Sequence, residues 1–397
     1  MTWRETTLGA GIHIKHGYAF KSEFFVNSGK YIVLTPGNFY EEGGFRLRAE
    51  KDRAYSGSIP ENFILSKGDI IIAMTEQDAG LLGSSALIPE NDRFLHNQRL
   101  GLIDKIDEEL FNKNFLYYLF NTYSIRGQIS GSASGTKVRH TSPDKIYRVK
   151  IKIPDVTTQQ KIADILSKYD DLIENNRRRI ELLERSARLL YKEWFVRLRF
   201  PGHEHTPIID GIPEGWEKVR LKDIADLTMG QSPESEYYNE DRSGLPFHQG
   251  VTNFGIRFPE NKVYCAKITR IANEGDILFS VRAPVGRMNI SLEKIIIGRG
   301  LAAIRAKHNY QGFLYYHLKN YFFKEDMIGS GVIFASVTKA GLENVQLIKP
   351  KDSILAIFLD KTISIDEQIK ILFRQNQKLK QARDILLPKL MNGEIEV

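Results

Sequence analysis

Two sets of basic and polar side chains stand on short loops rich in glycine and serine, and their chemistry suits a contact with nucleic acid. Lys and Arg side chains and backbone amides bind phosphate oxygens, whereas Arg, Lys, Asn, Gln and hydroxyl groups hydrogen-bond to base edges. The candidates in the first half of the chain are Lys15, His16, Tyr18, Lys21, Glu76, Gln77, Lys137, Arg139, His140 and Thr141. Those in the second half are Gln231, Ser232, Arg282, Arg287, Ser336, Thr338 and Lys339. Each residue alone fits an ordinary exposed side chain, so the prediction rests on the clusters and their recurrence.

Segments with the chemistry of a reaction centre are incomplete. "NSGKY" at 27–31 has a Gly-Lys pair but lacks the first glycine and the hydroxyl residue of a phosphate-binding loop. "DAGLLG" at 78–83 loosely resembles a methyl-donor loop, but no "NPPY"-like motif follows. Asp155 and Glu260 lie in different halves of the chain, and Asp155 stands where a helix is expected to start. We therefore predict no catalytic residue and no cofactor bound by this chain.

The histidines and the single cysteine do not form a recognisable metal-binding motif. His203 and His205 flank one glutamate in a segment rich in Pro and Gly, where such residues are usually solvated, so we predict no metal site. Cys265 is the single cysteine, which excludes an internal disulfide and fits a reducing cytoplasm.

Composition and charge favour a folded protein with an anionic partner. The chain has 397 residues, 42% of them apolar, which is enough for two or three packed domains. Its net charge of +7 indicates nucleic acid or an acidic protein surface as partner, although an ordinary basic protein also fits. No apolar run approaches the length of a membrane span or of a signal peptide, so we predict a protein that is neither membrane-spanning nor secreted.

The chain is a tandem repeat. Matching positions include Trp3 with Trp216, Gly68 with Gly275, Arg99 with Arg299, the "FLYY" at 115–118 with that at 313–316, Gly131-Ser132 with Gly329-Ser330, and Pro154 with Pro350. The "FLYY" aromatics are predicted to be core residues, because their spacing buries one face of a helix. Arg99 and Arg299 fit a salt bridge as well as a DNA contact.

Each repeat ends in a long segment whose apolar residues alternate spacings of four and three, which is the coiled-coil period. The predicted seam consists of Leu166, Ile173, Asn176, Ile180, Leu183 and Trp194 in the first helix, and Phe358, Ile365, Ile369, Leu372, Asn376, Leu379 and Leu386 in the second. Antiparallel pairing with Asn176 opposite Asn376 makes nearly every other layer apolar, for example Ile180 with Leu372. A buried Asn pair would fix the register; the alternative is that both asparagines face a wet end of the seam.

The expected fold class is α+β (mixed α/β), with two globular domains joined by two long antiparallel coiled-coil helices in an internal pseudo-two-fold repeat. Short strand-like runs such as "KYIVL", "GDIIIAM" and "GDILFSV" alternate with few helices, as in domains of this class. The predicted boundaries are a first domain at 1–153, a first long helix at 154–200, a linker at 201–214, a second domain at 215–349 and a second long helix at 350–397.

Such an arrangement suits the reading of a two-part DNA site. A helix of this length spans roughly 50 Å at about 1.5 Å per residue, and half-sites on one face of DNA recur at about 34–36 Å. We expect the helices to act as a ruler. Since the two domains have diverged, each is expected to read a different half-site, so the target is expected to be asymmetric.

The chain resembles the specificity subunits of Type I restriction–modification systems over essentially its whole length. The resemblance is carried by "GSASGTKVRHTSPDKIYRVKIKIPDVTTQQKIADIL" at 131–166, by "RSARLLYKEWFVRLRFPG" at 185–202 with "GIPEGWEKVRLKDI" at 211–224, and by "GDILFSVRAPVGR" at 275–287. It implies a cytoplasmic, non-catalytic subunit whose two target-recognition domains read double-stranded DNA.

The implied partners are two modification subunits and the restriction or translocase subunits. The first transfer a methyl group from S-adenosylmethionine to adenine, and the second use ATP, so both cofactors belong to the partners. The paired helices would set the spacing and dock the modification subunits. The alternative is a coiled-coil adaptor without a DNA-reading role, which gives no reason for divergent domains with basic loops.

Overall fold

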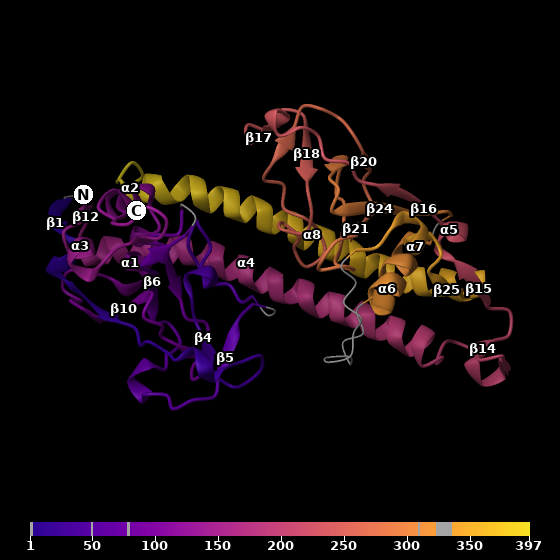
Figure 1. The fold of residues 1–397 in the computed structure, drawn as a ribbon. Helices are drawn as coiled ribbons and strands as arrows, with labels where there is room; N and C mark the ends of the chain where they lie inside the picture. The colour runs from indigo at the N-terminus through magenta and orange to yellow at the C-terminus, as the bar shows by residue number, and fades with distance from the viewer. Residues whose placement is uncertain (1–2, 49–50, 78–79, 309, 323–335) are drawn as a thin grey trace. The chain divides into compact units, whose positions relative to one another are not determined.

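The computed structural model describes residues 3–48, 51–77, 80–308, 310–322 and 336–397 (Figure 1). Asp78 of the "DAGLLG" segment and the Gly329-Ser330 pair lie outside the described residues. The chain divides into two compact units, residues 1–172 with 378–397, and residues 173–377.

The first unit contains two four-stranded sheets. One sheet has the order β2 (Ile12–His16), β10 (Leu100–Ile106), β6 (Ile70–Ala73), β8 (Ser85–Leu87). The other has the order β3 (Phe25–Val26), β5 (Arg53–Tyr55), β4 (Ile32–Val33), β9 (Phe94–Leu95). Two further pairs join β1 (Arg4–Thr7) to β12 (Lys150–Ile153), and β7 (Thr75–Glu76) to β11 (Arg139–His140). Short helices are α1 (Lys113–Phe120), α2 (Tyr123–Gly131) and α3 (Pro143–Tyr147), with 3-10 turns at Leu8–Ala10, Ser22–Phe24, Pro36–Asn38 and Glu61–Phe63.

The second unit repeats this plan. Its four-stranded sheet has the order β16 (Ala225–Met229), β24 (Leu301–Ala306), β21 (Ile277–Ser280), β22 (Met288–Ile290). A five-stranded sheet has the order β17 (Tyr238–Asn239), β19 (Tyr264–Cys265), β18 (Leu245–His248), β23 (Ile295–Ile297), β20 (Ile271–Ala272). Two pairs join β15 (Glu217–Arg220) to β25 (Gln346–Lys349), and β13 (Ile208–Ile209) to β14 (Ile212–Pro213). Short helices are α5 (Leu221–Ile224), α6 (Gln311–Phe322) and α7 (Lys339–Glu343), with 3-10 turns at His203–His205 and Ser235–Tyr237.

The register of the two repeats is visible in their central strands. Gly68 and Gly275 precede the buried strands β6 and β21 with φ of 83° and 86°, a backbone conformation that favours glycine. The predicted match of Arg99 with Arg299 is wrong by one residue. The carbonyl of Arg99 accepts from the Met74 amide at 3.1 Å, and the corresponding acceptor for the Val281 amide is the carbonyl of Gly300 at 3.0 Å.

Two long helices end the repeats: α4 (Val156–Tyr191), extended by a π-helical turn at Lys192–Val196, and α8 (Asp352–Met391). The expected helix-start role of Asp155 is confirmed. Its carboxylate accepts from the Thr158 amide at 2.9 Å and from the Thr158 hydroxyl at 2.8 Å, and these bonds lower the pKa of Asp155. Each helix contributes residues to both units, because the division falls at 172/173 and at 377/378.

The duplicated "FLYY" aromatics are core residues, as predicted. Phe115 and Tyr118 of α1 are buried in the core of the first unit, and Phe313 and Tyr316 of α6 are buried in that of the second. Each unit therefore buries its aromatic helix between its sheets and its portions of α4 and α8.

A fully buried histidine makes the stability of the first unit sensitive to acid. Burial lowers the pKa of His96 to about 4, while Nε2 contacts the Leu100 carbonyl oxygen at 3.0 Å. The folded chain keeps His96 neutral down to about pH 4, whereas the unfolded chain protonates it near pH 6.5. The contribution of His96 to the stability of the folded state is therefore fully present above pH 6.5. This stability is lost, at about 1.4 kcal/mol per pH unit, as the pH falls toward 4.

Glutamine at position 96 keeps a donor for the Leu100 carbonyl but does not titrate. Between pH 6.5 and 4 we therefore expect the His96→Gln variant to bind about one proton fewer on unfolding than the native chain, so its free energy of unfolding should depend less on pH. Denaturant unfolding at pH 7, 5.5 and 4.5 measures this. The exposed His205→Gln variant is the control and should keep the native pH dependence. An unchanged slope in His96→Gln would contradict the assignment.

Candidate nucleic-acid interface

Most of the candidate residues of the first unit meet at one edge of its central sheet. The C-terminal ends of β2 and β6 flank the start of β10, because His16 pairs with Gly101 and Ala73 pairs with Leu100. Tyr18 forms a bridge with Asn97, and β7 and β11 follow at the same end. We call this the first edge, consisting of residues 15–18, 75–77, 97–99 and 139–141.

Glu76 is a support of the first edge and not one of its contact residues. Its buried carboxylate accepts from the amides of Gly80, Leu81 and Leu82 at 3.1, 3.0 and 2.8 Å, and from Nη1 of Arg139 at 3.1 Å. A side chain enclosed in this way has no free face for a base edge. The prediction of Glu76 as a DNA-binding residue is therefore corrected: the residue orders the loop after β7 and orients Arg139. Thr141 is also buried, so its hydroxyl faces the protein.

The remaining candidate side chains of the first unit differ in how many contacts they make with the rest of the protein. The Lys15 ammonium donates to the Asn62 carbonyl at 2.6 Å and lies 4.6 Å from the centroid of the Phe63 ring. The ring of Tyr18 packs 5.3 Å from that of Phe63 and 5.1 Å from that of Phe20, and the residue remains 36% exposed. Exposed side chains belong to His16, Lys21, Gln77, Lys137 and His140. This surface can offer donors to phosphates and both donors and acceptors to base edges.

The second unit presents an edge built in the same way. The Gly230 amide donates to the Leu301 carbonyl at 2.9 Å, and the Gln231 amide donates to that of Ile297 at 2.9 Å. Arg282 follows β21 and forms a bridge with Ser336. We call residues 229–232, 281–283, 298–300 and 336–339 the second edge.

Contacts at the second edge fix some of its side chains. The Ser232 hydroxyl donates to Oε1 of Gln249 at 2.7 Å. Thr338 caps α7 by accepting from the Gly341 amide at 3.1 Å, and Lys339 lies 3.5 Å from the carboxylate of Glu343 in the same helix. Gln231, Arg282, Ser336, Thr338 and Lys339 are exposed. Arg287 directly precedes β22, its amide donates to the Ser280 hydroxyl at 2.8 Å, and burial lowers the pKa of its guanidinium.

A glycine in each repeat makes the edge possible. A Cβ on Gly17 would lie 2.0 Å from the carbonyl oxygen of Asn97, and one on Gly230 would lie 2.1 Å from that of Gly298. Only glycine lets the two backbones approach so closely. The loops that carry the candidate side chains are thus held together by the same backbone contact in both units.

Sequence reasoning missed several polar residues at the two edges. Asn97 and Gln98 lie on the loop that Tyr18 contacts, and Gln249 holds Ser232 in the second unit. The only signal in the sequence was the polar run "HNQR" directly before a strand, which by itself also fits a solvated turn.

Most of the predicted seam residues of the second unit pack between α4 and α8. Asn176 is 7% exposed, and its Nδ2 donates to Oδ1 of Asn376 at 3.0 Å, while Asn376 donates to the Ile173 carbonyl at 3.1 Å. The pair therefore lies within the seam and not at a wet end. Packing partners in the second unit are Ile180, Leu183, Ile365, Ile369 and Leu372, with Trp194 beside Phe358. Leu166 and Leu386 share the core of the first unit. The layer of Ile173 with Leu379 joins residues of different units and stays a prediction.

No helix among the described residues has the length and apolarity needed to cross a membrane. Within those same stretches of chain, no three His, Cys, Asp or Glu side chains gather closely enough to share a metal ion.

Two repeats of one α+β unit, each with a polar edge and with portions of the two long helices, define a tandem-repeat protein of mixed helix and strand content. The chain belongs to the family described as type I restriction modification DNA specificity domain, whose sequence model matches residues 1–185 and 213–381. The expected fold class and family are thereby confirmed. Membership of a DNA specificity family supports a recognition role and not the alternative of a coiled-coil adaptor.

Named relatives agree with this family. The chain is similar to the putative type I restriction enzyme MjaX specificity subunit of Methanocaldococcus jannaschii, with 30% identity over 347 residues that cover 83% of this chain and 79% of the relative. The MjaIX specificity subunit of the same organism is 30% identical over 299 residues, covering 71% and 69%. The solved S subunit of a type I restriction–modification system from M. genitalium matches with a TM-score of 0.56 at 20% identity, covering 98% and 96%, and supports the fold alone.

Proposed function

We propose that the chain is the non-catalytic DNA-reading subunit of a type I restriction–modification enzyme and that it binds an asymmetric two-part site in the cytoplasm. The observation that carries this proposal is the pair of edges. Both are built on the same backbone frame, in which Gly17 or Gly230 closes on the loop before β10 or β24. The side chains on that frame differ between the units, with Lys, His, Tyr and Arg at the first edge and mainly Gln, Ser, Thr and Arg at the second. A shared frame with different side chains suits two different half-sites.

The proposed partners are two modification subunits, which would transfer a methyl group from S-adenosylmethionine to adenine, and restriction subunits that would use ATP. In this proposal α4 and α8 set the spacing of the half-sites and dock the modification subunits. Support comes from large apolar side chains that both helices expose, such as Leu182 at 62% and Ile363 at 61%. Isolated exposed leucines are ordinary, but their recurrence along both helices suits a protein partner.

Methylation mapping tests the proposal directly. Genomic DNA from cells that carry this chain and a modification subunit should show adenine methylation at one sequence motif with two separated parts. A motif with a single continuous part, or no chain-dependent methylation, would contradict it.

Independence of the two domains gives a separate prediction. Replacing the first domain, residues 1–153 up to Pro154, by that of a relative should change one half of the methylated motif and leave the other half intact. The reason is that the first edge is built entirely from residues 15–18, 75–77, 97–99 and 139–141, all within the exchanged part. Methylation mapping of the chimera measures both halves, with the native chain as control. A change in both halves would show that the domains do not read independently.

A further inference from the structure

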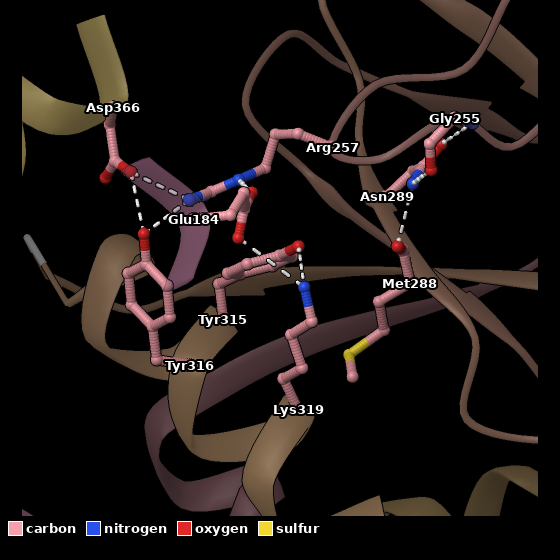
Figure 2. Close-up of polar contacts among 9 residues, drawn as sticks. All are labelled: Glu184, Gly255, Arg257, Met288, Asn289, Tyr315, Tyr316, Lys319 and Asp366. Atoms are coloured by element: carbon pink, nitrogen blue, oxygen red, sulfur yellow. Dashed lines mark hydrogen bonds and ion pairs between the residues drawn. The ribbon is translucent and has the colours of Figure 1, made fainter. Parts of the chain in front are cut away.

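Arg257 is a buried arginine on the hairpin 253–260 of the second domain, between β18 and β19. It is 3% exposed. Its Nε donates to Glu184 of α4, and its Nη2 donates to Asp366 of α8 at 2.9 Å and to the hydroxyl of Tyr316 of α6 (Figure 2). One guanidinium therefore binds a recognition domain to both long helices within the second unit.

Aromatic and charged side chains surround the Arg257 guanidinium. Its carbon lies 4.2 Å from the centroid of the Tyr315 ring. Lys319 donates to the Tyr315 hydroxyl at 3.1 Å and lies 3.5 Å from the second carboxylate oxygen of Glu184 (Figure 2). Burial raises the pKa of Asp366, and Arg257 and the Tyr316 hydroxyl oppose that rise. Without the guanidinium, Asp366 and Glu184 would lose the planar double donor that a lysine cannot replace.

The first unit contains the same grouping with a different arginine. The hydroxyl of Tyr118 donates to Oδ2 of Asp170 at 2.7 Å, and Nη1 of Arg383 donates to Oδ1 of Asp170 at 2.6 Å. Tyr118 corresponds to Tyr316 in the repeated "FLYY" segment, and Asp170 corresponds to Asp366, since 366 − 170 = 196, the same interval as between Pro154 and Pro350. Both units thus join the aromatic helix to a long helix through Tyr, Asp and Arg.

What differs is the element that supplies the arginine. Arg383 lies on α8, and its counterpart on α4 is Ala187, since 383 − 187 = 196, a fully buried alanine in the second core. The second unit fills that role with Arg257 from a recognition domain. In the first unit the hairpin between Phe39 and Phe45 is tied elsewhere, because Arg126 of α2 donates to the carbonyl of Glu41.

The hairpin that carries Arg257 rests on the long helices, and the chain that leads into it contacts the second edge. At its tip Phe258 packs with Ile180, Ile369 and Leu372 of the two long helices. The Ile290 amide donates to the Arg257 carbonyl at 2.8 Å. Gln249, four residues before the hairpin, accepts a hydrogen bond from the Ser232 hydroxyl at 2.7 Å. Orientation of the hairpin on the helices is therefore passed to a candidate contact residue.

We propose that Arg257 is the positioning residue that sets the second recognition domain on the paired helices, a role that Arg383 of α8 fills for the first domain. The inference deepens the proposed function and rests on it for its effect on DNA. The first domain can be exchanged without touching its arginine. A second domain grafted without an arginine at the place of Arg257 leaves Glu184 and Asp366 without the guanidinium that joins them.

The test compares three full-length chains: native, Arg257→Met, and Arg257→Met combined with Ala187→Arg. The double variant moves the guanidinium to the helix position that Arg383 occupies in the other repeat. Arg242→Met removes an exposed arginine of the same unit and is the matched control. Amide hydrogen exchange of the free chain, which needs no DNA, reports on the hairpin.

In Arg257→Met we expect exchange across 254–260 and at Ile290 to rise by about 100-fold or more, since a buried ion pair has lost one partner. The double variant is expected to recover part of the native protection, because the guanidinium again pairs with a buried carboxylate. Arg242→Met changes an exposed side chain and is expected to stay within about threefold of the native chain. Native exchange in Arg257→Met would overturn the proposal. A loosened hairpin that Ala187→Arg fails to restore would overturn the equivalence of the two arginines and with it the proposal.

The second measurement is adenine methylation by each chain with its modification subunits, on duplexes altered in one half-site at a time. Arg257→Met should lose discrimination at the second half-site by about tenfold or more and keep it at the first, with recovery in the double variant. Equal loss at both half-sites, or full discrimination at both, would overturn the proposal. If the native chain supports no methylation while hydrogen exchange behaves as expected, the proposed function fails, but the positioning role of Arg257 stands.

Discussion

Purified alone and supplied with S-adenosylmethionine, the chain should transfer no methyl group to DNA, and the same chain mixed with modification subunits should methylate adenine at one two-part site. This expectation follows from the proposed non-catalytic role, in which the modification subunits carry the methyl-transfer reaction. Specificity and chemistry would then lie on different chains. Because the expected contrast is between no product and full methylation, this is the largest effect predicted for the protein.

The measurement is transfer of labelled methyl groups to duplexes that contain or lack the mapped motif. Modification subunits without the chain are the first control and should give no motif-dependent product. The second control is the chain with S-adenosylmethionine over an extended incubation. Methyl transfer by the chain alone would overturn the assignment to a non-catalytic subunit.

Local patterns in the sequence were sufficient for the repeat, the long helices and the aromatic core. Heptad spacing is a local property, so the seam could be placed before any partner was known, and the opposition of Asn176 and Asn376 followed from aligning the two helices. The match of Gly68 with Gly275 also depends on a local property, because the turn before each strand requires a positive φ, which favours glycine.

Long-range polar contacts were beyond the sequence. Glu76 stands among exposed-looking polar residues, but the amides that enclose it belong to a loop whose path is set by the tertiary fold. Arg257 lies in a hairpin with several apolar residues, and nothing nearby in sequence indicates its partners Glu184 and Asp366. The mismatch of Arg99 with Arg299 arose because identical residues one position apart align more readily than Arg with Gly300. The hydrogen-bond register reveals the true match.

The same reasoning gives the second large effect, in the helix seam. Ile180 is 4% exposed and packs with Phe258, Ile369 and Leu372, and Leu183 lies partly buried beside them. Introducing Lys at both positions would place two ammonium groups in an apolar layer. Burying even one such charge without a partner costs several kcal/mol, so we expect the second unit to lose most of its free energy of unfolding.

Because Phe258 rests on this layer, the loss should extend to the hairpin that carries Arg257 and to recognition of the second half-site. Chemical unfolding and binding to the mapped two-part duplex measure the two effects. A matched control replaces Leu182 and Leu189 of the same helix by Lys, since these side chains are 62% and 48% exposed and their change should alter stability by only about 0.5 kcal/mol each. The control also tests docking, because a loss of methylation with unchanged DNA binding would place the modification subunits on that face of α4. If the Ile180 and Leu183 double variant bound the two-part site with native affinity and native stability, the seam would not hold the second domain in place, and the role proposed for the paired helices would have to be withdrawn.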